Sequence, residues 1–171
     1  MNALFTAVRA MVWATAFLSL WGWLALAVRR YDAALGGALA DWTPYAGWPL
    51  VVAGAALALT CVALFVVRGR GTPAPFDAPQ KFVAVGPYRH VRNPMYLGGI
   101  ATLAGCALVF RSPAMLVFVL VPCGCVQVFL LAFEEPDLNA RFGESYRAYQ
   151  RAVPRWRPRL IPWRGPDGGG V

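Results

Sequence analysis

Four long apolar stretches, separated by short polar segments, dominate the pattern along the chain. They cover about residues 4–28, 47–67, 94–110 and 114–133. A helix needs about 20 apolar residues to cross a hydrocarbon core about 30 Å thick. By that measure the third stretch, at roughly 17 residues, is a short span. The pattern predicts an all-α, polytopic integral membrane protein with about four transmembrane helices.

The third and fourth stretches are separated only by Arg111, Ser112 and Pro113. So short a connection joins antiparallel neighbours, and proline fits the first turn of the next helix. We therefore expect a C-terminal helical hairpin in which the start of one helix lies beside the end of the other. In that arrangement Tyr96 and Glu134 are near neighbours.

A more polar segment, about residues 136–151, follows the hairpin. Its apolar residues recur at spacings of four, four and three, with charged residues on the other faces, and are Leu138, Phe142, Tyr146 and Tyr149. This periodicity predicts an amphipathic helix. We expect it to be an interfacial helix at the membrane surface.

The same pattern divides the chain into two units and a tail. Residues 1–67 are expected to form an N-terminal transmembrane hairpin, whose first span is too long for the core of a signal peptide. Residues 68–164 are expected to form a loop, the C-terminal hairpin and a cytoplasmic tail helix. Within the loop, residues 69–80 are rich in Pro and Gly, which predicts an irregular linker. Residues 165–171 are expected to be disordered.

Basic residues set the expected orientation. Of the 171 residues, 58% are hydrophobic and 14% are charged, and the formal net charge is +8. Most arginines gather in residues 68–92 and 141–164, which an even number of crossings separates, whereas Arg29, Arg30 and Arg111 fall on the opposite side. The positive-inside rule places both basic segments and the N-terminus in the cytoplasm, at a cell inner membrane or an endomembrane. Arginines beside apolar spans favour lipid headgroups over nucleic acid as partners.

The four cysteines predict neither a metal site nor a disulfide framework. All of them lie inside apolar stretches and none has the C-x-x-C spacing of a zinc site; they are Cys61, Cys106, Cys123 and Cys125. We interpret them as small apolar packing residues.

Residues 86–98, with the sequence G-P-Y-R-H-V-R-N-P-M-Y-L-G, break the membrane pattern and contain the only histidine of the chain. A structural interpretation makes Asn93 the N-cap and Pro94 the first residue of a helix. A functional interpretation adds that a helix start offers free backbone N–H groups to an anionic ligand group. The residues by themselves leave both interpretations open.

Two adjacent acids, Glu134 and Glu135, end the last apolar stretch. If the helix also ends there, both carboxylates oppose its dipole, and they repel each other. We expect a positive group to compensate them, either an arginine from position 89, 92 or the tail, or a cationic ligand. A carboxylate at a membrane boundary is also a candidate for ligand binding.

These residues carry a resemblance to a known family. The segment 86–98, then F-E-E-P-D-L-N-A-R-F-G-E-S-Y-R-A-Y and V-P-R-W-R-P-R-L, resemble the membrane methyltransferases. That group includes isoprenylcysteine carboxyl methyltransferases and phospholipid N-methyltransferases. The resemblance covers residues 81–160, and the combination of R-[HN]-P-x-Y-x-G, E-E-P and F-G-x-x-Y-x-x-Y makes it specific.

The resemblance implies S-adenosylmethionine as methyl donor, held in a cytoplasmic pocket built from the last helices and the tail. The residues that it implies for this pocket are Tyr88, His90, Val91, Asn93, Pro94, Tyr96, Leu97, Glu134 and Glu135. The catalytic candidates are His90, Arg92, Asn93 and Glu134. Asparagine at position 93 stands where many members have histidine, although phospholipid-type members also carry asparagine. No G-x-G-x-x-G follows a predicted strand, which excludes a Rossmann methyltransferase.

Methyl transfer is a direct displacement, in which catalysis comes mainly from positioning. A thiolate or carboxylate acceptor needs no base, whereas an amine needs one, for which His90 or a glutamate is the candidate. A lipid amine, a prenylated thiol-carboxylate and a small thiol all stay open as acceptors. We expect the acceptor to enter from the bilayer.

Two other functions remain as alternatives. One is a membrane reductase that uses NAD(P)H, because sterol-reductase-type proteins are similar in the C-terminal region. The other is a non-catalytic membrane protein that keeps the hairpin as a scaffold.

Overall fold

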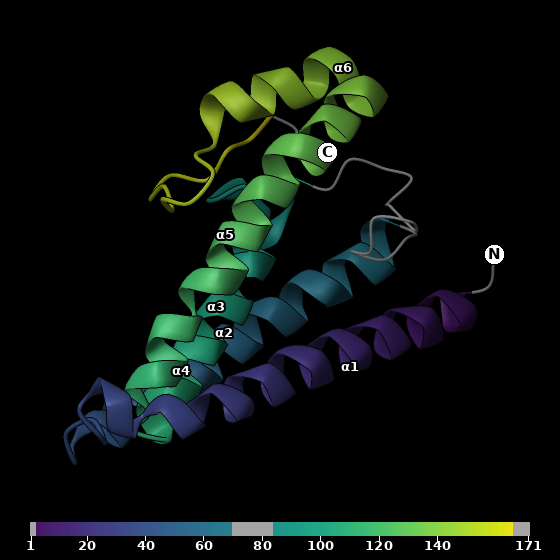
Figure 1. Ribbon diagram of the computed structural model, residues 1–171. Helices are drawn as coiled ribbons and strands as arrows, with labels where there is room; N and C mark the ends of the chain where they lie inside the picture. The colour runs from purple at the N-terminus through teal and green to yellow at the C-terminus, as the bar shows by residue number, and fades with distance from the viewer. Residues whose placement is uncertain (1–2, 70–83, 166–171) are drawn as a thin grey trace.

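The computed structural model describes residues 3–69 and 84–165, and every regular element in these two ranges is helical (Figure 1). The first three long helices are α1 (Ala3–Val28), α2 (Thr43–Leu64) and α3 (Pro94–Val109). Each lies within a few residues of an apolar stretch, so the predicted elements are confirmed. The predicted linker at 69–80 and the predicted disordered tail lie almost entirely outside the described residues.

The fourth apolar stretch forms a nearly continuous helical rod. It consists of α4 (Pro113–Phe118), α5 (Leu120–Phe129) and a π-helical turn, η6 (Leu130–Glu134). Helix α6 (Glu135–Ala152) comes directly after it and turns across the end of the bundle (Figure 1). The expectation that a helix ends at the two acids is therefore wrong. Glu135 lies in the first turn of α6, where a carboxylate is favourable.

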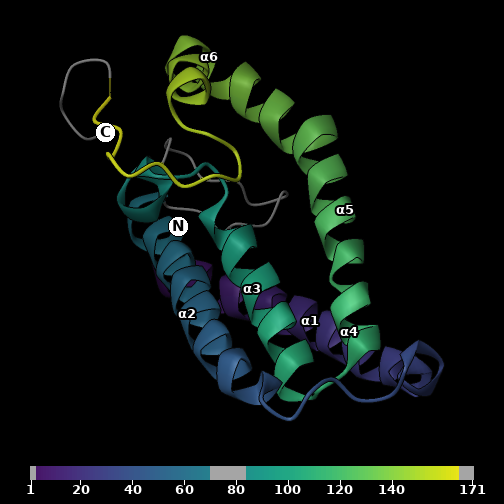
Figure 2. The same ribbon diagram turned by 90° about the vertical axis from the view of Figure 1, so that its left-hand side faces the viewer.

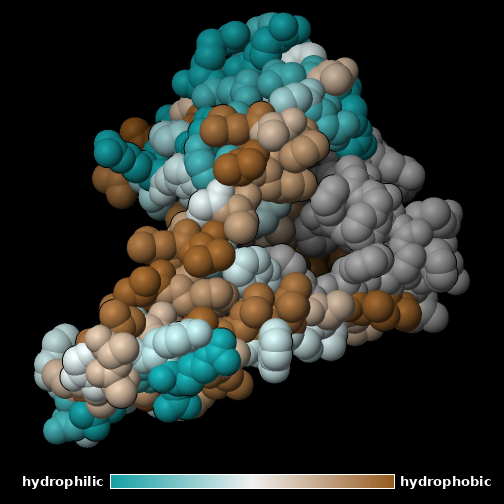
Figure 3. Space-filling view, in the orientation of Figure 1, coloured by the Kyte–Doolittle hydropathy of each residue, from teal (hydrophilic) through white to brown (hydrophobic). Residues whose placement is uncertain are grey.

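Two helical stretches are long and apolar enough to cross a membrane, Thr43–Val67 with 25 residues and Pro113–Ala152 with 40. Helix α3 is apolar but shorter. In the most apolar 18-residue segment of each long helix, only 11% and 17% of the segment, respectively, is buried inside the protein. Outward-facing apolar side chains on helices of this length indicate a membrane protein. In this view, hydrophobic atoms gather over the middle of the bundle, whereas the α6 end at the top and the opposite end at the lower left also show hydrophilic atoms (Figure 3).

Helices α2 and α3 pack side by side along a seam of glycines. A Cβ atom added to Gly54 would lie 2.6 Å from the carbonyl oxygen of Gly98, and one added to Gly98 would lie 2.6 Å from that of Gly54. Gly47 and Gly105 approach each other in the same way further along the two helices. Close contact between small residues is how membrane helices associate without a hydrophobic driving force. This seam fixes the position of α3.

The connection between α3 and α4 is tied to the chain that follows α1. The Asp32 carboxylate accepts hydrogen bonds from Ser112 Oγ at 2.7 Å and from the Ala114 amide at 3.0 Å. Arg111, with φ of 54°, donates from Nε to the Leu39 carbonyl at 2.8 Å. Ser112 in turn caps α4 through the Met115 amide. The turn of the predicted hairpin is thus fully bonded.

At the opposite end, α5 stands well apart from α3 (Figure 2). Helix α6 spans part of that end with its apolar face inward. The positions that the periodicity selected form its inner face, because Tyr146, Tyr149 and Val153 build a buried cluster with Leu138 and Phe142 packed against it. The predicted amphipathic segment is therefore confirmed as helical, although a kink at Gly143, with φ of 53° and ψ of −127°, divides it into two helices.

Candidate functional site

The open end of the hairpin brings the first turn of α3 to the end of η6. Tyr96 Oη donates a hydrogen bond of 2.8 Å to Glu134 Oε2. This contact confirms that the two residues are near neighbours. It depends on the antiparallel arrangement, because 38 residues separate them along the chain.

The adjacent acid has a different environment. Glu135 Oε1 accepts from Arg92 Nη1 at 2.8 Å and from Arg155 Nε at 2.9 Å, while its Oε2 accepts from Arg155 Nη2 at 2.8 Å. The side chains of Arg92 and Glu135 are each 12% exposed. Glu135 is therefore neutralised by two guanidinium groups, and it joins the start of α6, the start of α3 and the tail.

Glu134 has no such partner. Within the described part of the chain, its carboxylate is bonded to the Tyr96 hydroxyl and no cation pairs with it, although it is half-buried. A partly buried carboxylate without a cation is costly for the folded protein. The sequence left open whether an arginine or a ligand compensates the acids, and the structure gives arginines to Glu135 alone. Glu134 keeps unused acceptor capacity for a ligand hydroxyl or ammonium group.

The tail runs back along the segment that precedes α3. The Arg92 amide donates to the Pro154 carbonyl, the Arg159 amide to the His90 carbonyl, and the Trp163 amide to the Arg89 carbonyl, each at 2.9 Å. These bonds place the tail over the start of α3. They hold in place part of the segment 86–98, which interrupts the apolar pattern of the sequence.

His90 is oriented by this pairing. Its Nδ1 lies 2.8 Å from the Arg159 carbonyl oxygen. Because a carbonyl only accepts, Nδ1 carries the proton in this contact. In a neutral imidazole, Nε2 is then left with a lone pair, which is the form that a general base requires.

Asn93 does not act as the expected N-cap. It is 7% exposed, and its side chain makes no capping hydrogen bond; Nδ2 instead points to the Arg155 carbonyl at the long distance of 3.5 Å. The expected cap is therefore wrong, because the tail draws the amide away from the helix. Pro94 does begin α3, and the first amides of this helix are left without a side-chain cap.

Tyr88 and Val91, two other predicted pocket residues, are buried. The Tyr88 ring packs edge-on against Phe65 of the π-helical turn that ends α2, with centroids 5.4 Å apart, and Tyr149 Oη donates to its carbonyl at 2.7 Å. Burial raises the pKa of Tyr88 well above its ordinary value, so its hydroxyl stays neutral. Its ring contacts the end of α2, and Leu97 is half-buried in α3.

Two residues at this end were missed by sequence reasoning, Trp156 and Gln127, and Arg155 was covered only by the general expectation that an arginine of the tail compensates the acids. Trp156 Nε1 donates to Gln127 Oε1 at 3.0 Å, so the tail reaches α5 well before Glu134. Gln127 is the only amide or charged side chain between residues 114 and 133. A polar residue inside an apolar span marks a functional or structural contact, and that signal was available. Nothing in the sequence showed that Trp156 contacts Gln127, or that Arg155 is the tail arginine that pairs with Glu135.

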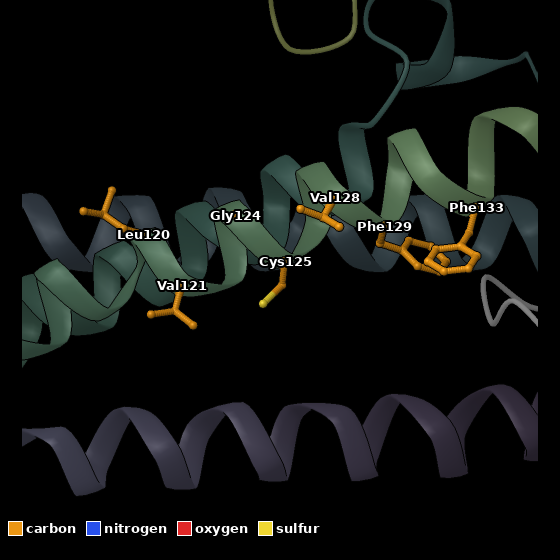
Figure 4. A pocket seen from close by; sticks show the side chains of 7 residues that line it. All are labelled: Leu120, Val121, Gly124, Cys125, Val128, Phe129 and Phe133. Carbon is orange, nitrogen blue, oxygen red and sulfur yellow. The ribbon is translucent and has the colours of Figure 1, made fainter.

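An open apolar groove of about 620 Å³ follows the outer side of α5. It is lined by Leu120, Val121, Gly124, Cys125, Val128, Phe129 and Phe133. Val121 and Cys125 point from α5 toward α1 (Figure 4). Phe133, at one end of the groove, precedes Glu134 in the sequence, but neither Glu134 nor Tyr96 lines the groove.

Fold and site together define an all-helical protein with apolar spans and an acidic, aromatic site at the end of a helical hairpin. The model of the phospholipid methyltransferase family matches residues 42–145, which include α2, α3, α5 and both acids. The chain belongs to this family. The predicted resemblance is therefore confirmed.

Relatives with curated names agree with this family. Methanethiol S-methyltransferase 1 of Bradyrhizobium diazoefficiens is 33% identical over 70% of this chain and 40% of its own. Methanethiol S-methyltransferase 2 of the same organism is 40% identical over 47% of this chain and 30% of its own. Phosphatidylethanolamine N-methyltransferase of Talaromyces marneffei is 30% identical over 56% of this chain and 10% of its own. The matches thus span less than half the length of each of these relatives. No solved structure matches the chain.

Proposed function

We propose that this protein is a membrane methyltransferase that uses S-adenosylmethionine and methylates an acceptor delivered from the bilayer. The observation that carries the proposal is Glu134, a half-buried carboxylate without a cation, held by Tyr96 at the uncapped start of α3. Relatives are named for the methylation of methanethiol and phosphatidylethanolamine, which supports this reaction class.

The residues present fit such a donor. The open oxygen of Glu134 suits a ribose hydroxyl or an ammonium group. The first amides of α3 suit a carboxylate, because a helix start favours anions. Tyr96 adds an aromatic ring, and Val91, Pro94 and Leu97 shape the surrounding wall. When bound, the donor supplies a methyl group activated by its sulfonium.

In this proposal the protein mainly positions the donor and the acceptor, and it supplies a general base where the acceptor needs one. Glu134 and Tyr96 orient the donor, while Arg92 acts through Glu135 to hold the start of α3 beside α6. The Nε2 lone pair of His90 accepts a proton if the acceptor is an amine. A thiolate or carboxylate acceptor needs no such step. Asn93 is buried under the tail and shapes the wall of the site between His90 and Tyr96.

The groove along α5 supports entry of the acceptor from the bilayer. It is lined by residues of the α4–α5 rod, and the last of them, Phe133, precedes Glu134 in the chain. A lipid amine or a prenylated thiol-carboxylate has a chain that fits such a surface, and a small apolar thiol also partitions into it. These three acceptor classes are the ones that we propose.

We further propose that the chain crosses the membrane four times, through α1, α2, α3 and the α4–α5 rod. In this arrangement the site, α6 and the basic tail are on the cytoplasmic face. The concentration of arginines at that end supports this orientation.

Equilibrium binding to the purified protein tests the proposed function. We expect S-adenosylmethionine to bind and NADPH not to bind. Glu134→Gln should weaken donor affinity about 10- to 100-fold, because a hydrogen bond to a charged group is lost, and the melting temperature should not fall, because the substitution removes a partly buried charge that has no cation. Glu144→Gln on the exposed face of α6 is the matched control and should bind normally.

Glu135→Gln tests whether the two acids have different roles. It leaves Arg92 and Arg155 without their carboxylate, so we expect a loss of about 2–3 kcal/mol in unfolding free energy. Binding of NADPH alone would support the reductase alternative, and binding of neither molecule would support the scaffold alternative. Either result contradicts the proposed function.

A further inference from the structure

The tail presents two large apolar side chains outside the apolar spans. Leu160 is 95% exposed and Ile161 is 72% exposed. Leu160 is the most exposed large apolar residue in the part of the chain that the structure describes. Exposed apolar residues elsewhere are mostly on helices that face lipid, whereas these two lie on an irregular segment beyond α6.

This exposure does not result from a loose chain. The Arg159 amide is bonded to the His90 carbonyl, and the Trp163 amide to the Arg89 carbonyl, each at 2.9 Å. The two bonds hold the backbone on both sides of Leu160 and Ile161. The protein therefore presents the pair on a fixed loop.

The position of the loop corresponds to a membrane boundary. Its anchors, Arg89 and His90, come shortly before Pro94, where the apolar helix α3 begins. The tail accordingly lies at the level of the start of α3 in Figure 1, and its projecting tip shows hydrophobic and hydrophilic atoms side by side in Figure 3. At that depth an apolar side chain meets the boundary between headgroups and acyl chains.

Two arginines flank the pair and are available for a ligand. Arg157 and Arg164 are exposed, and neither is paired with a carboxylate of a described residue. By contrast, Arg155 binds Glu135 and Arg159 donates to the Ala152 carbonyl. Free guanidinium groups beside exposed apolar side chains match anionic phospholipids, whose phosphates are next to their acyl chains.

We propose that residues 157–164 form a docking loop that inserts Leu160 and Ile161 into the cytoplasmic leaflet and binds anionic phospholipid through Arg157 and Arg164. The occupant is the bilayer around the protein. Two side chains offer far less area than the roughly 800 Å² per partner of a stable protein interface. The proposal rests on the proposed membrane orientation but does not depend on the methyltransferase activity.

Photocrosslinking of the full chain in liposomes tests the loop. Leu160 is replaced by photoreactive p-benzoylphenylalanine, and adducts are identified by mass spectrometry. Leu59 on the outer face of α2 serves as the lipid-facing control and Glu144 on α6 as the water-facing control. We expect phospholipid adducts at positions 160 and 59 and none at 144. Adducts at 59 without adducts at 160, or crosslinks from 160 to a second chain, would overturn the proposal.

The arginines are tested in liposomes of phosphatidylcholine mixed with phosphatidylglycerol. We expect enrichment of phosphatidylglycerol among the adducts at position 160, by about fivefold for each arginine at low salt. Arg157→Gln with Arg164→Gln should remove this enrichment while leaving the adducts themselves. Arg147→Gln, which changes an arginine paired with Glu144, is the control. Equal enrichment in the double variant would contradict the role of the two arginines.

Discussion

The two ends of the hairpin formed by α3 and the α4–α5 rod differ in how completely their polar groups are bonded. At the closed end, Asp32 accepts from Ser112 and Ala114, and Ser112 is fully buried. At the open end, Glu134 has one neutral donor and no cation among the described residues, and α5 stands away from α3. The closed end is therefore satisfied within the protein, whereas Glu134 at the open end has unused acceptor capacity, on which the proposed donor site depends. The same hairpin has both ends because the bonded turn holds α3 and α4 together, whereas α3 and α5 diverge towards Tyr96 and Glu134.

The largest effect should come from a change that disturbs both ends at once. Gly98→Leu places a side chain where even a Cβ would be 2.6 Å from the Gly54 carbonyl, so α3 cannot stay on α2. We expect a loss of about 3 kcal/mol in unfolding free energy, and donor binding should be lost with it. Gly99→Leu is the matched control, since nothing lies within 4 Å of its Cβ. Chemical unfolding in detergent measures both, and equal stability of the two variants would show that the seam is not close-packed.

A change at the closed end should affect stability alone. Asp32→Ala leaves the buried Ser112 hydroxyl and the Ala114 amide without their acceptor. We expect a loss of about 1–2 kcal/mol in unfolding free energy. Donor affinity of the folded protein should be unchanged. If donor affinity fell as much as in Glu134→Gln, the two ends would not be functionally separate.

The smallest effect should come from the open end, mainly on affinity. Tyr96→Phe removes the hydroxyl that holds Glu134 and keeps the ring. We expect donor affinity to fall about five- to tenfold, the value of one hydrogen bond, with a small decrease in melting temperature because the half-buried Glu134 carboxylate loses its donor. Tyr45→Phe on the exposed start of α2 is a control. A stability loss without a change in affinity would make the Tyr96–Glu134 contact purely structural.

The approximate positions of the helices could be predicted from the sequence, because a bilayer requires long apolar runs and each run here is bounded by arginine, proline or glutamate. The three-residue connection also predicted that Tyr96 and Glu134 meet. The sequence did not show that the chain stays helical through the acids. A π-helical turn at Leu130–Glu134 holds one extra residue, which rotates the start of α6 by about 100°.

The sequence by itself determined that this chain is helical, apolar and folded back on itself near two acids, since periodicity and loop length are local properties. Only the tertiary structure decided which acid is neutralised and which is open. The difference between the two acids depends on Arg92 and on Arg155. Arg155 lies 20 residues beyond Glu135 in the sequence and contacts it because the tail folds back. The direction of a side chain depends on the rotation of its helix and on the return of the tail, and neither can be derived from local sequence.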